Sequence, residues 1–113
     1  MAKPVIRICH DFQIQAFRNR DETDDRLKGG SETYAFPHLR GRKCTVFTEN
    51  TALAGLFRDR LEKGGGVIAI DLDTVPDGDK GFWEKTGDWH VSWGVVFAHG
   101  RELTPEETAA LMA

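Results

Sequence analysis

The stretch of residues 44–73 constrains the fold most, because it contains the complete pattern of a strand, a helix and a second strand. Residues 45–48 are β-branched or aromatic, as expected in a half-buried strand. The side chain of Asn50 can accept a hydrogen bond from the first amides of the helix. Gly64 can end the helix, since glycine adopts the left-handed conformation without a steric clash. The apolar run that follows predicts an interior strand at residues 67–72.

The predicted helix is amphipathic. Its apolar side chains recur at spacings of three, four and eight residues, which places them on one stripe, while charged side chains fill the opposite face. The stripe consists of Leu53, Leu56, Phe57 and Leu61. We therefore expect this helix to be the main one packed against the sheet.

The flanking segments predict further elements. Residues 4–9 form a short apolar run, and residues 90–97 alternate in polarity, so each predicts a strand. Residues 19–31 lack periodicity and indicate a long loop, whereas residues 73–89 are rich in Asp, Gly and Pro and indicate turns. The Thr-Pro-Glu-Glu run at 104–107 has the pattern of a capping box that starts a short C-terminal helix.

A chain of 113 residues is long enough for one hydrophobic core and too short for two. We therefore expect residues 1–113 to form a single α+β domain. Its sheet should be mixed or largely antiparallel, with one main amphipathic helix and a short C-terminal helix packed on it.

Charge and hydropathy limit the classes of partner. The formal net charge is −3 and the pI is about 5.8, so nucleic acid is a disfavoured partner, although Arg40, Arg42 and Lys43 form a local basic cluster. The sequence contains no apolar run of membrane-spanning length and no export signal. We expect a cytoplasmic protein without a membrane segment.

The residues that commonly bind metals are arranged in no recognised pattern. No two histidines have helical i, i+4 spacing and no Cys-x-x-Cys motif occurs, so we expect no metal site. The aspartates at 71, 73, 77 and 79 lack the glycine and glutamate of a calcium loop and fit a solvated turn better. Cys9 and Cys44 lie in predicted strands, which favours buried, reduced thiols over a disulfide.

Three weak motifs occur in order along the chain. The first predicted strand ends at His10, and a middle strand ends in Val-Phe-Thr before a helix that contains Ala54. The last predicted strand leads through a short turn to Glu-Leu-Thr-Pro-Glu. Taken together, these motifs resemble those of the small, toxin-like members of the ADP-ribosyltransferase superfamily.

The resemblance implies a split sheet that binds NAD in the cleft between its two parts and transfers ADP-ribose to an acceptor, with release of nicotinamide. His10 would be a catalytic and cofactor-binding residue that orients a ribose hydroxyl. Phe47 and Thr48 would line the cofactor cleft, and Tyr34 would be a catalytic and cofactor-binding aromatic that stacks on nicotinamide. Bond cleavage in such enzymes passes through an oxocarbenium-like state that a nearby carboxylate stabilises.

The sequence departs from the family pattern at this carboxylate. The family's glutamate corresponds to the residues Ser92, Trp93 and Gly94, none of which is acidic. Glu102 is the nearest acid downstream, beyond the predicted strand. Some members of the family that lack the glutamate transfer a single unit or are inactive.

Two hypotheses of function follow. The first, implied by the resemblance, is a small toxin or phage-type effector that modifies a host macromolecule, with a protein as the acceptor. The second is a non-enzymatic, acidic inhibitor that blocks a host protein complex, with Asp24, Asp25, Trp83 and Trp89 as partner-binding residues. The aromatic residues Tyr34, Phe36 and Phe47 also fit an ordinary role in the core and at its rim.

Overall fold

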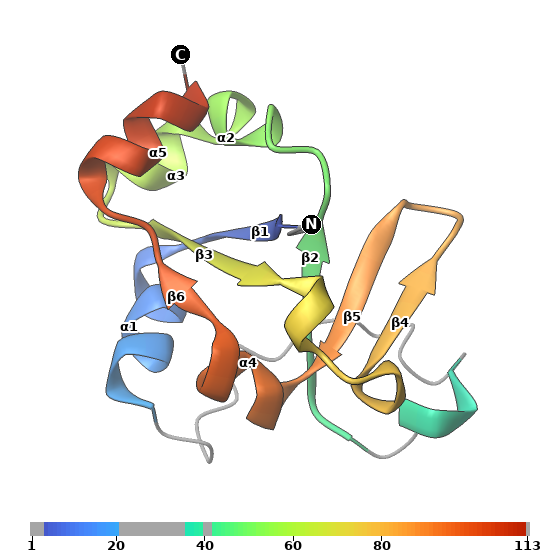
Figure 1. The fold of residues 1–113 in the computed structure, drawn as a ribbon. Helices are drawn as coiled ribbons and strands as arrows, with labels where there is room; N and C mark the ends of the chain where they lie inside the picture. The colour runs from blue at the N-terminus through green and yellow to red at the C-terminus, as the bar shows by residue number, and fades with distance from the viewer. Residues whose placement is uncertain (1–3, 21–35, 40–41, 113) are drawn as a thin grey trace.

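A computed structural model of the chain describes residues 4–20, 36–39 and 42–112. Within these residues, six strands form one antiparallel sheet in the order β4-β5-β2-β1-β3-β6 (Figure 1). The predicted α+β class is confirmed, and the sheet is antiparallel throughout. The strands are β1 (Pro4–Cys9), β2 (Cys44–Thr48), β3 (Gly66–Asp71), β4 (Lys80–Trp83), β5 (Asp88–Ser92) and β6 (Arg101–Glu102).

Helices pack on both faces of the sheet (Figure 1). One hydrophobic cluster joins the sheet to α1 and α4, and a second joins it to α2, α3 and α5. The α-helices are α1 (Asp11–Asn19), α2 (Leu53–Leu56), α3 (Arg58–Glu62), α4 (Trp93–His99) and α5 (Pro105–Met112). Among the described residues, three short 3-10 helices are η3 (Pro37–Leu39), η4 (Leu72–Thr74) and η5 (Asp77–Asp79).

The sheet divides between β1 and β2. Every residue of β1 pairs with β3, and every residue of β2 pairs with β5. Between β1 and β2, in contrast, the paired position is Ile6 with Thr48. The pairing of β1 with β2 is thus confined to the end of β2, the two strands diverge away from it, and the sheet consists of a β1-β3-β6 part and a β2-β5-β4 part (Figure 1). This agrees with the expected split sheet.

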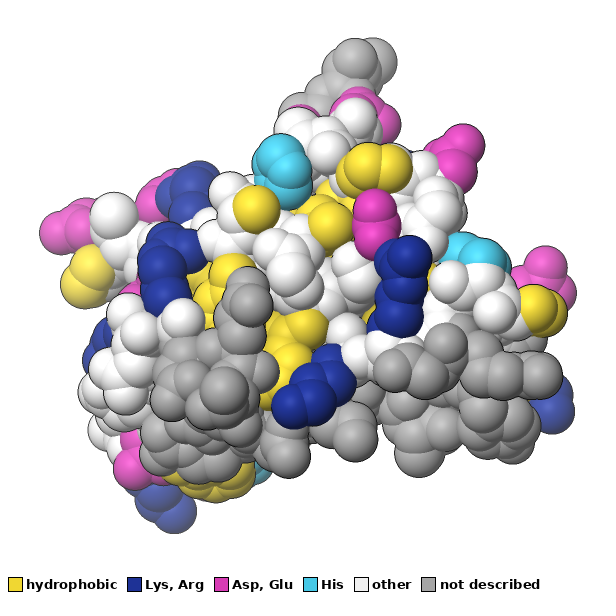
Figure 2. Space-filling model, turned by 90° about the horizontal axis from the view of Figure 1, so that it is seen from below, with side chains coloured by type: hydrophobic (Ala, Val, Ile, Leu, Met, Phe, Trp, Pro, Cys, Tyr) yellow, Lys and Arg dark blue, Asp and Glu magenta, His cyan; other side chains and the backbone are white. Residues whose placement is uncertain are grey.

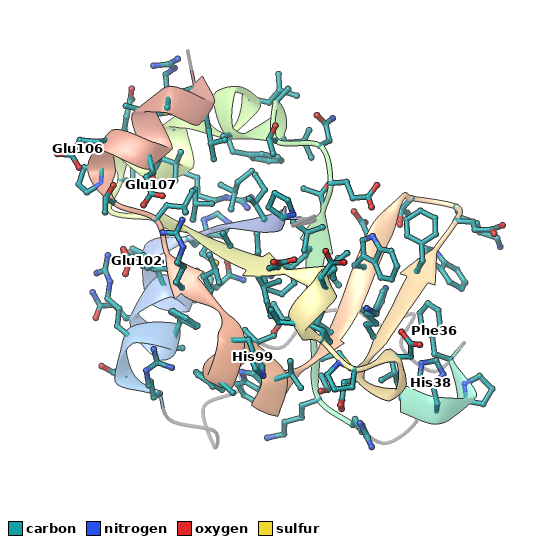
Figure 3. The ribbon with its side chains drawn as sticks, in the orientation of Figure 1. Phe36, His38, His99, Glu102, Glu106 and Glu107 are labelled. Carbon is teal, nitrogen blue, oxygen red and sulfur yellow. The ribbon has the colours of Figure 1, made fainter. Side chains whose placement is uncertain are left out.

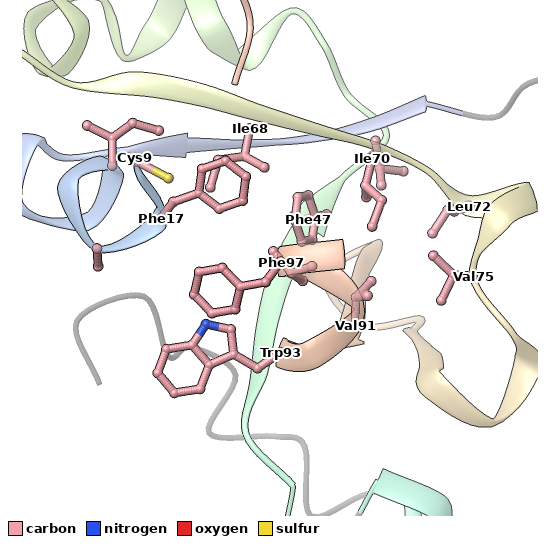
Figure 4. Packing of buried hydrophobic residues seen from close by; sticks show 14 residues of the cluster. Cys9, Phe17, Phe47, Ile68, Ile70, Leu72, Val75, Val91, Trp93 and Phe97 are labelled. Carbon is pink, nitrogen blue, oxygen red and sulfur yellow. The ribbon is translucent and has the colours of Figure 1, made fainter. Parts of the chain in front are cut away.

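The larger hydrophobic cluster fills the space between the two parts of the sheet, α1 and α4 (Figure 4). The Phe97 ring stacks with Phe17 at 5.9 Å and with Trp93 at 5.7 Å between ring centroids. Phe47 of β2 is 1% exposed and belongs to the same cluster. On the face seen from below Figure 1, Lys and Arg side chains border the apolar surface (Figure 2), and Lys43 Nζ lies 4.9 Å from the Trp93 ring centroid.

The predicted strand at residues 90–97 is wrong in its second half. β5 ends at Ser92, and residues 93–99 form α4. The physical reason is that Trp93, Val96 and Phe97 are buried together, at spacings of three and four residues that a helix places on one face. The predicted turn region at 73–89 contains turns, but it also contains strand β4, which the sequence interpretation missed.

The predicted main helix exists but is divided. α2 and α3 meet at Phe57, whose backbone leaves the helical conformation at φ −107° and ψ 30°. The predicted buried stripe is therefore wrong in its middle, where Leu56 is 78% exposed and Phe57 is 37% exposed.

The predicted helix ends are confirmed at Gly64 and at Thr104, whereas the main helix begins at Leu53, with Ala52 and not Asn50 at its N-cap. Asn50 Oδ1 accepts a hydrogen bond from the Ala52 amide at 3.2 Å, and Gly64 has a φ of +93°. At the C-terminal helix, Thr104 Oγ1 accepts from the Glu107 amide at 3.2 Å, and a Glu107 carboxylate oxygen accepts from the Thr104 amide at 3.0 Å. These contacts form the predicted capping box.

Candidate functional site

A pocket of about 320 Å³ lies where β1 and β2 diverge. It is bordered by both strands, by the start of α1, by α2 and α3, and by the first residue of β5. Its lining comprises Ile6, Arg7, Ile8, His10, Gln13, Val46, Phe47, Thr48, Leu53, Phe57, Arg60 and Asp88. The pocket thus contains three of the residues that the sequence analysis assigned to a cofactor cleft, namely His10, Phe47 and Thr48.

His10 lies between the end of β1 and the start of α1, and it is exposed. Its carbonyl accepts hydrogen bonds from the Gln13 and Ile14 amides at 3.1 and 3.0 Å. Its own amide donates to the Gln13 side chain at 3.0 Å, and its ring stacks on Phe12 at 5.4 Å with an angle of 6° between the planes. The backbone and ring of His10 are therefore held in place at the mouth of the pocket.

Phe47 and Thr48 differ in how they contribute to the pocket. Phe47 is a core residue, which leaves little of its ring for contact with a ligand. Thr48 is half-buried, pairs with Ile6 on one side and Asp88 on the other, and accepts a hydrogen bond from the Asn50 amide at 3.1 Å. Thr48 therefore marks the position where the β1-β3-β6 and β2-β5-β4 parts of the sheet meet.

Asp88 is a pocket residue that the sequence interpretation missed. It is the first residue of β5, it is half-buried, and its register partner on β2 is Thr48. A carboxylate therefore stands at the start of β5, four residues before Ser92. β5 starts earlier in the sequence than predicted. The alternation of polar and apolar residues in Asp-Trp-His-Val was the sequence signal for this earlier start.

Two arginines also line the pocket and were missed. Arg7 Nη1 donates to the Val46 carbonyl at 3.1 Å, so its side chain bridges the gap between β1 and β2. Arg60 Nη1 donates to the Ile8 carbonyl at 2.9 Å from α3. A charged residue inside the apolar run of β1 was a signal in the sequence, whereas nothing in the helix pattern distinguished Arg60 from the charged residues around it.

The two arginines influence the Cys9 thiol, which is buried at the end of β1. Burial raises its pKa to about 11, although the positive charges of Arg7 and Arg60 act to lower it. The thiol therefore stays protonated and unreactive at neutral pH. Cys9 and Cys44 are both free and buried, as predicted.

A second pocket, of about 510 Å³, shares His10, Phe57 and Arg60 with the first. It is otherwise lined by Asp11, Leu56, Asp59 and Lys63. Ligand sites in proteins commonly measure about 300–1,000 Å³. Both pockets fall within this range, they meet at His10, Phe57 and Arg60, and their charged lining includes Arg7, Arg60, Lys63 and the carboxylates of Asp88, Asp11 and Asp59.

Glu102 lies away from this pocket. It belongs to β6, at the opposite edge of the sheet from β4, whereas Phe36 and His38 lie beside β4 (Figure 3). Both of its carboxylate oxygens accept from the Arg18 guanidinium, at 2.7 and 2.6 Å, and this hydrogen bonding raises the pKa of Arg18. Ser92, one of the three residues that the resemblance aligned with a glutamate, donates to Asp79 at 2.9 Å.

The partner-binding residues of the inhibitor hypothesis are only partly described. Trp83 and Trp89 lie on the β4–β5 hairpin, and the Trp89 ring packs on Phe82 at 5.1 Å. Trp89 Nε1 donates to Glu49 at 3.0 Å, and Lys85 Nζ lies 5.6 Å from the Trp83 ring centroid. Asp24, Asp25 and Tyr34 lie outside the described residues, as does most of the predicted loop at 19–31.

Two further observations concern metals and membranes. Among residues 4–20, 36–39 and 42–112, no three His, Cys, Asp or Glu side chains are grouped so that they could hold a metal ion. Within the same part of the chain, no helix has the length and apolar character needed to cross a membrane.

Comparisons with models of known protein families, with curated proteins and with solved structures found no match for this chain.

Proposed function

We propose that this protein is an ADP-ribosyltransferase-like protein that binds NAD in the pocket between β1 and β2. In this proposal it modifies a protein acceptor of a host in the cytoplasm, as a small toxin or phage-type effector. One observation carries the proposal: His10, Thr48 and Asp88 come from three separate segments of the chain and line one pocket at the split of the sheet.

The chemistry of the lining supports the proposal. When bound, NAD supplies an ADP-ribosyl group, and positive charge develops on its ribose as the bond to nicotinamide breaks. The Asp88 carboxylate is half-buried, where the attraction between unlike charges is stronger than in bulk water. Asp88 would stabilise the developing charge, while His10 and Thr48 would bind and orient hydroxyl groups.

Replacement of the carboxylate tests this role. Asp88→Asn keeps the size of the side chain and removes its charge, so we expect nicotinamide release from NAD to fall by about 100-fold or more. NAD affinity should change much less. Release is measured by chromatography of the products after incubation of the purified protein with NAD.

Glu102→Gln is the matched control, because it removes a carboxylate that is paired with Arg18 at a distant edge of the sheet. It should leave the release rate unchanged. A wild-type protein that releases no nicotinamide, or equal losses in the two variants, would contradict the proposed function.

The β4–β5 hairpin favours a second candidate function, the non-enzymatic inhibitor. Phe82 is 40% exposed and packs on Trp89, so aromatic side chains are available on this hairpin for a protein partner. If the protein acts as an inhibitor, Trp83→Ala and Trp89→Ala should abolish its effect on the target complex. His10→Ala should have no effect in that case, whereas it should abolish the effect of a transferase.

A further inference from the structure

The pocket between β1 and β2 is lined by two guanidinium groups, those of Arg7 and Arg60. Among the described residues, neither Arg7 nor Arg60 forms an ion pair, and Arg7 Nε is buried without a hydrogen-bond partner. Arg18, Arg42 and Arg101 differ, since they bind Glu102, Asp79 and Glu107 respectively, at 2.6–2.7 Å. Arg20 and Arg58 also lack an ion pair among the described residues but do not line this pocket, so what distinguishes Arg7 and Arg60 is that both line it.

The positive charges of Arg7 and Arg60 lie beside the same part of the pocket. Arg7 is bonded to the carbonyl of Val46 and Arg60 to that of Ile8, and both carbonyls belong to residues that line the pocket. Each guanidinium also acts on the Cys9 thiol, which adjoins them at the end of β1. Partly buried positive charges that lack a counter-charge are costly, and an anion in the pocket would relieve that cost.

The pocket is also polarised along β1. Asp88 is the register partner of Thr48, and Thr48 in turn pairs with Ile6 of β1. Arg60 donates to the carbonyl of Ile8, which lies two residues, or about 7 Å, further along β1. Beyond Ile8, His10 adds an imidazole at the mouth. The pocket therefore has an acidic end at Asp88 and a basic end at Arg60.

From this arrangement we infer that the Arg7–Arg60 end of the pocket binds the pyrophosphate group of a phosphorylated small molecule. Guanidinium groups present parallel N–H donors that match pairs of phosphate oxygens, and the two groups suit the two phosphates. The inference rests on the proposed function in one respect, namely that NAD is the ligand that carries the pyrophosphate. The basic end would then hold the pyrophosphate, and the acidic end would face the part of the ligand that becomes positively charged.

Binding of inorganic pyrophosphate tests the inference directly. We expect calorimetry at low salt to show saturable binding to the wild-type protein, and Arg60→Gln to weaken it by about tenfold or more. Arg58→Gln is the matched control, since Arg58 is an exposed residue of the same helix and does not line the pocket. Equal affinities of the two variants would overturn the inference, because binding would then be a general effect of surface charge.

A second measurement uses only the wild-type protein, in case loss of the Arg60 bond to Ile8 disturbs the fold. The Nε–H signals of arginine side chains can be followed by NMR during a titration with pyrophosphate. The signals of Arg7 and Arg60 should shift, and those of the ion-paired Arg18, Arg42 and Arg101 should not. A titration that leaves the Arg7 and Arg60 signals unchanged would also overturn the inference.

The same calorimetry with NAD separates this inference from the proposed function. Binding of pyrophosphate but not of NAD, with dependence on Arg60, would support the anion site and reject the proposed function. Binding of NAD that is independent of Arg60, without binding of pyrophosphate, would reject the anion site and leave the proposed function intact.

Discussion

The ring of Phe12 has an unusual position for a large apolar residue. It is 45% exposed, yet it lies parallel to the His10 ring at the mouth of the pocket. Aromatic side chains in such stacks stabilise one another by about 0.5–1.5 kcal/mol. Phe12 therefore has more to contribute to the orientation of His10 than to the stability of the core.

Substitution of Phe12 should accordingly affect ligand binding more than stability. We expect Phe12→Ala to weaken NAD binding by about twofold to tenfold, the loss that corresponds to one stacked pair. Phe82→Ala removes a ring that is similarly exposed, at 40%, but lies on β4, and it should leave NAD affinity unchanged. Calorimetry of both variants checks this, and equal affinities would show that the stack has no role in the site.

Glu107, in the first turn of α5, makes the free energy of unfolding depend on pH. The hydrogen bond from Arg101, followed by that from the Thr104 amide, lowers the pKa of Glu107 from 4.5 to about 2. A carboxylate with a lowered pKa in the folded state stabilises the fold above its unfolded pKa, and this contribution is lost as the pH falls through the folded value. The relevant window is therefore between about pH 4.5 and pH 2.

Glu107→Gln should remove this pH dependence. We expect the wild-type protein to be more stable than the variant at neutral pH, and the difference to shrink as the pH falls from about 4.5 to about 2. Urea unfolding at several pH values in this range measures the difference. A constant difference across the range would contradict the assignment.

At the scale of elements, the division of α2 from α3 changes which apolar residues stabilise the fold. Phe47→Ala removes a ring that is 1% exposed and should destabilise the protein by about 3–5 kcal/mol. Leu56→Ala, in the predicted stripe, should change the stability by less than about 0.5 kcal/mol because Leu56 is 78% exposed. Thermal or denaturant unfolding distinguishes these results, and a large loss in Leu56→Ala would favour the continuous helix.

The elements that could be predicted from the sequence are those with local signals. Gly64 and the Thr104 capping box act on the backbone next to them, so these two helix ends could be placed correctly. Asn50 binds the Ala52 amide in the turn before α2, and the helix begins only at Leu53. The residues of α4 carried no such signal. Valines and aromatics fit a strand and a buried helix about equally well, and only the packing of Trp93 and Phe97 against Phe17 and the sheet determines the helix.

At the scale of the whole molecule, the candidate site exists because the sheet is split. His10 and Thr48 could be proposed from the sequence, since each follows or ends a recognisable strand. Asp88, Arg7 and Arg60 could not, because their common position depends on the pairing of β2 with β5 and on where α3 packs. Sequence periodicity shows which face a residue occupies and does not show which strands are neighbours.

The central claim is that the pocket between β1 and β2 binds NAD, and calorimetry with NAD tests it most directly. The wild-type protein and His99→Ala, which alters an exposed histidine of α4 outside this pocket, should bind saturably. His10→Ala should bind about tenfold more weakly or worse, because a charged or polar contact to the ligand is lost. Absence of binding at millimolar NAD, or equal binding by His10→Ala and the wild-type protein, would contradict the claim.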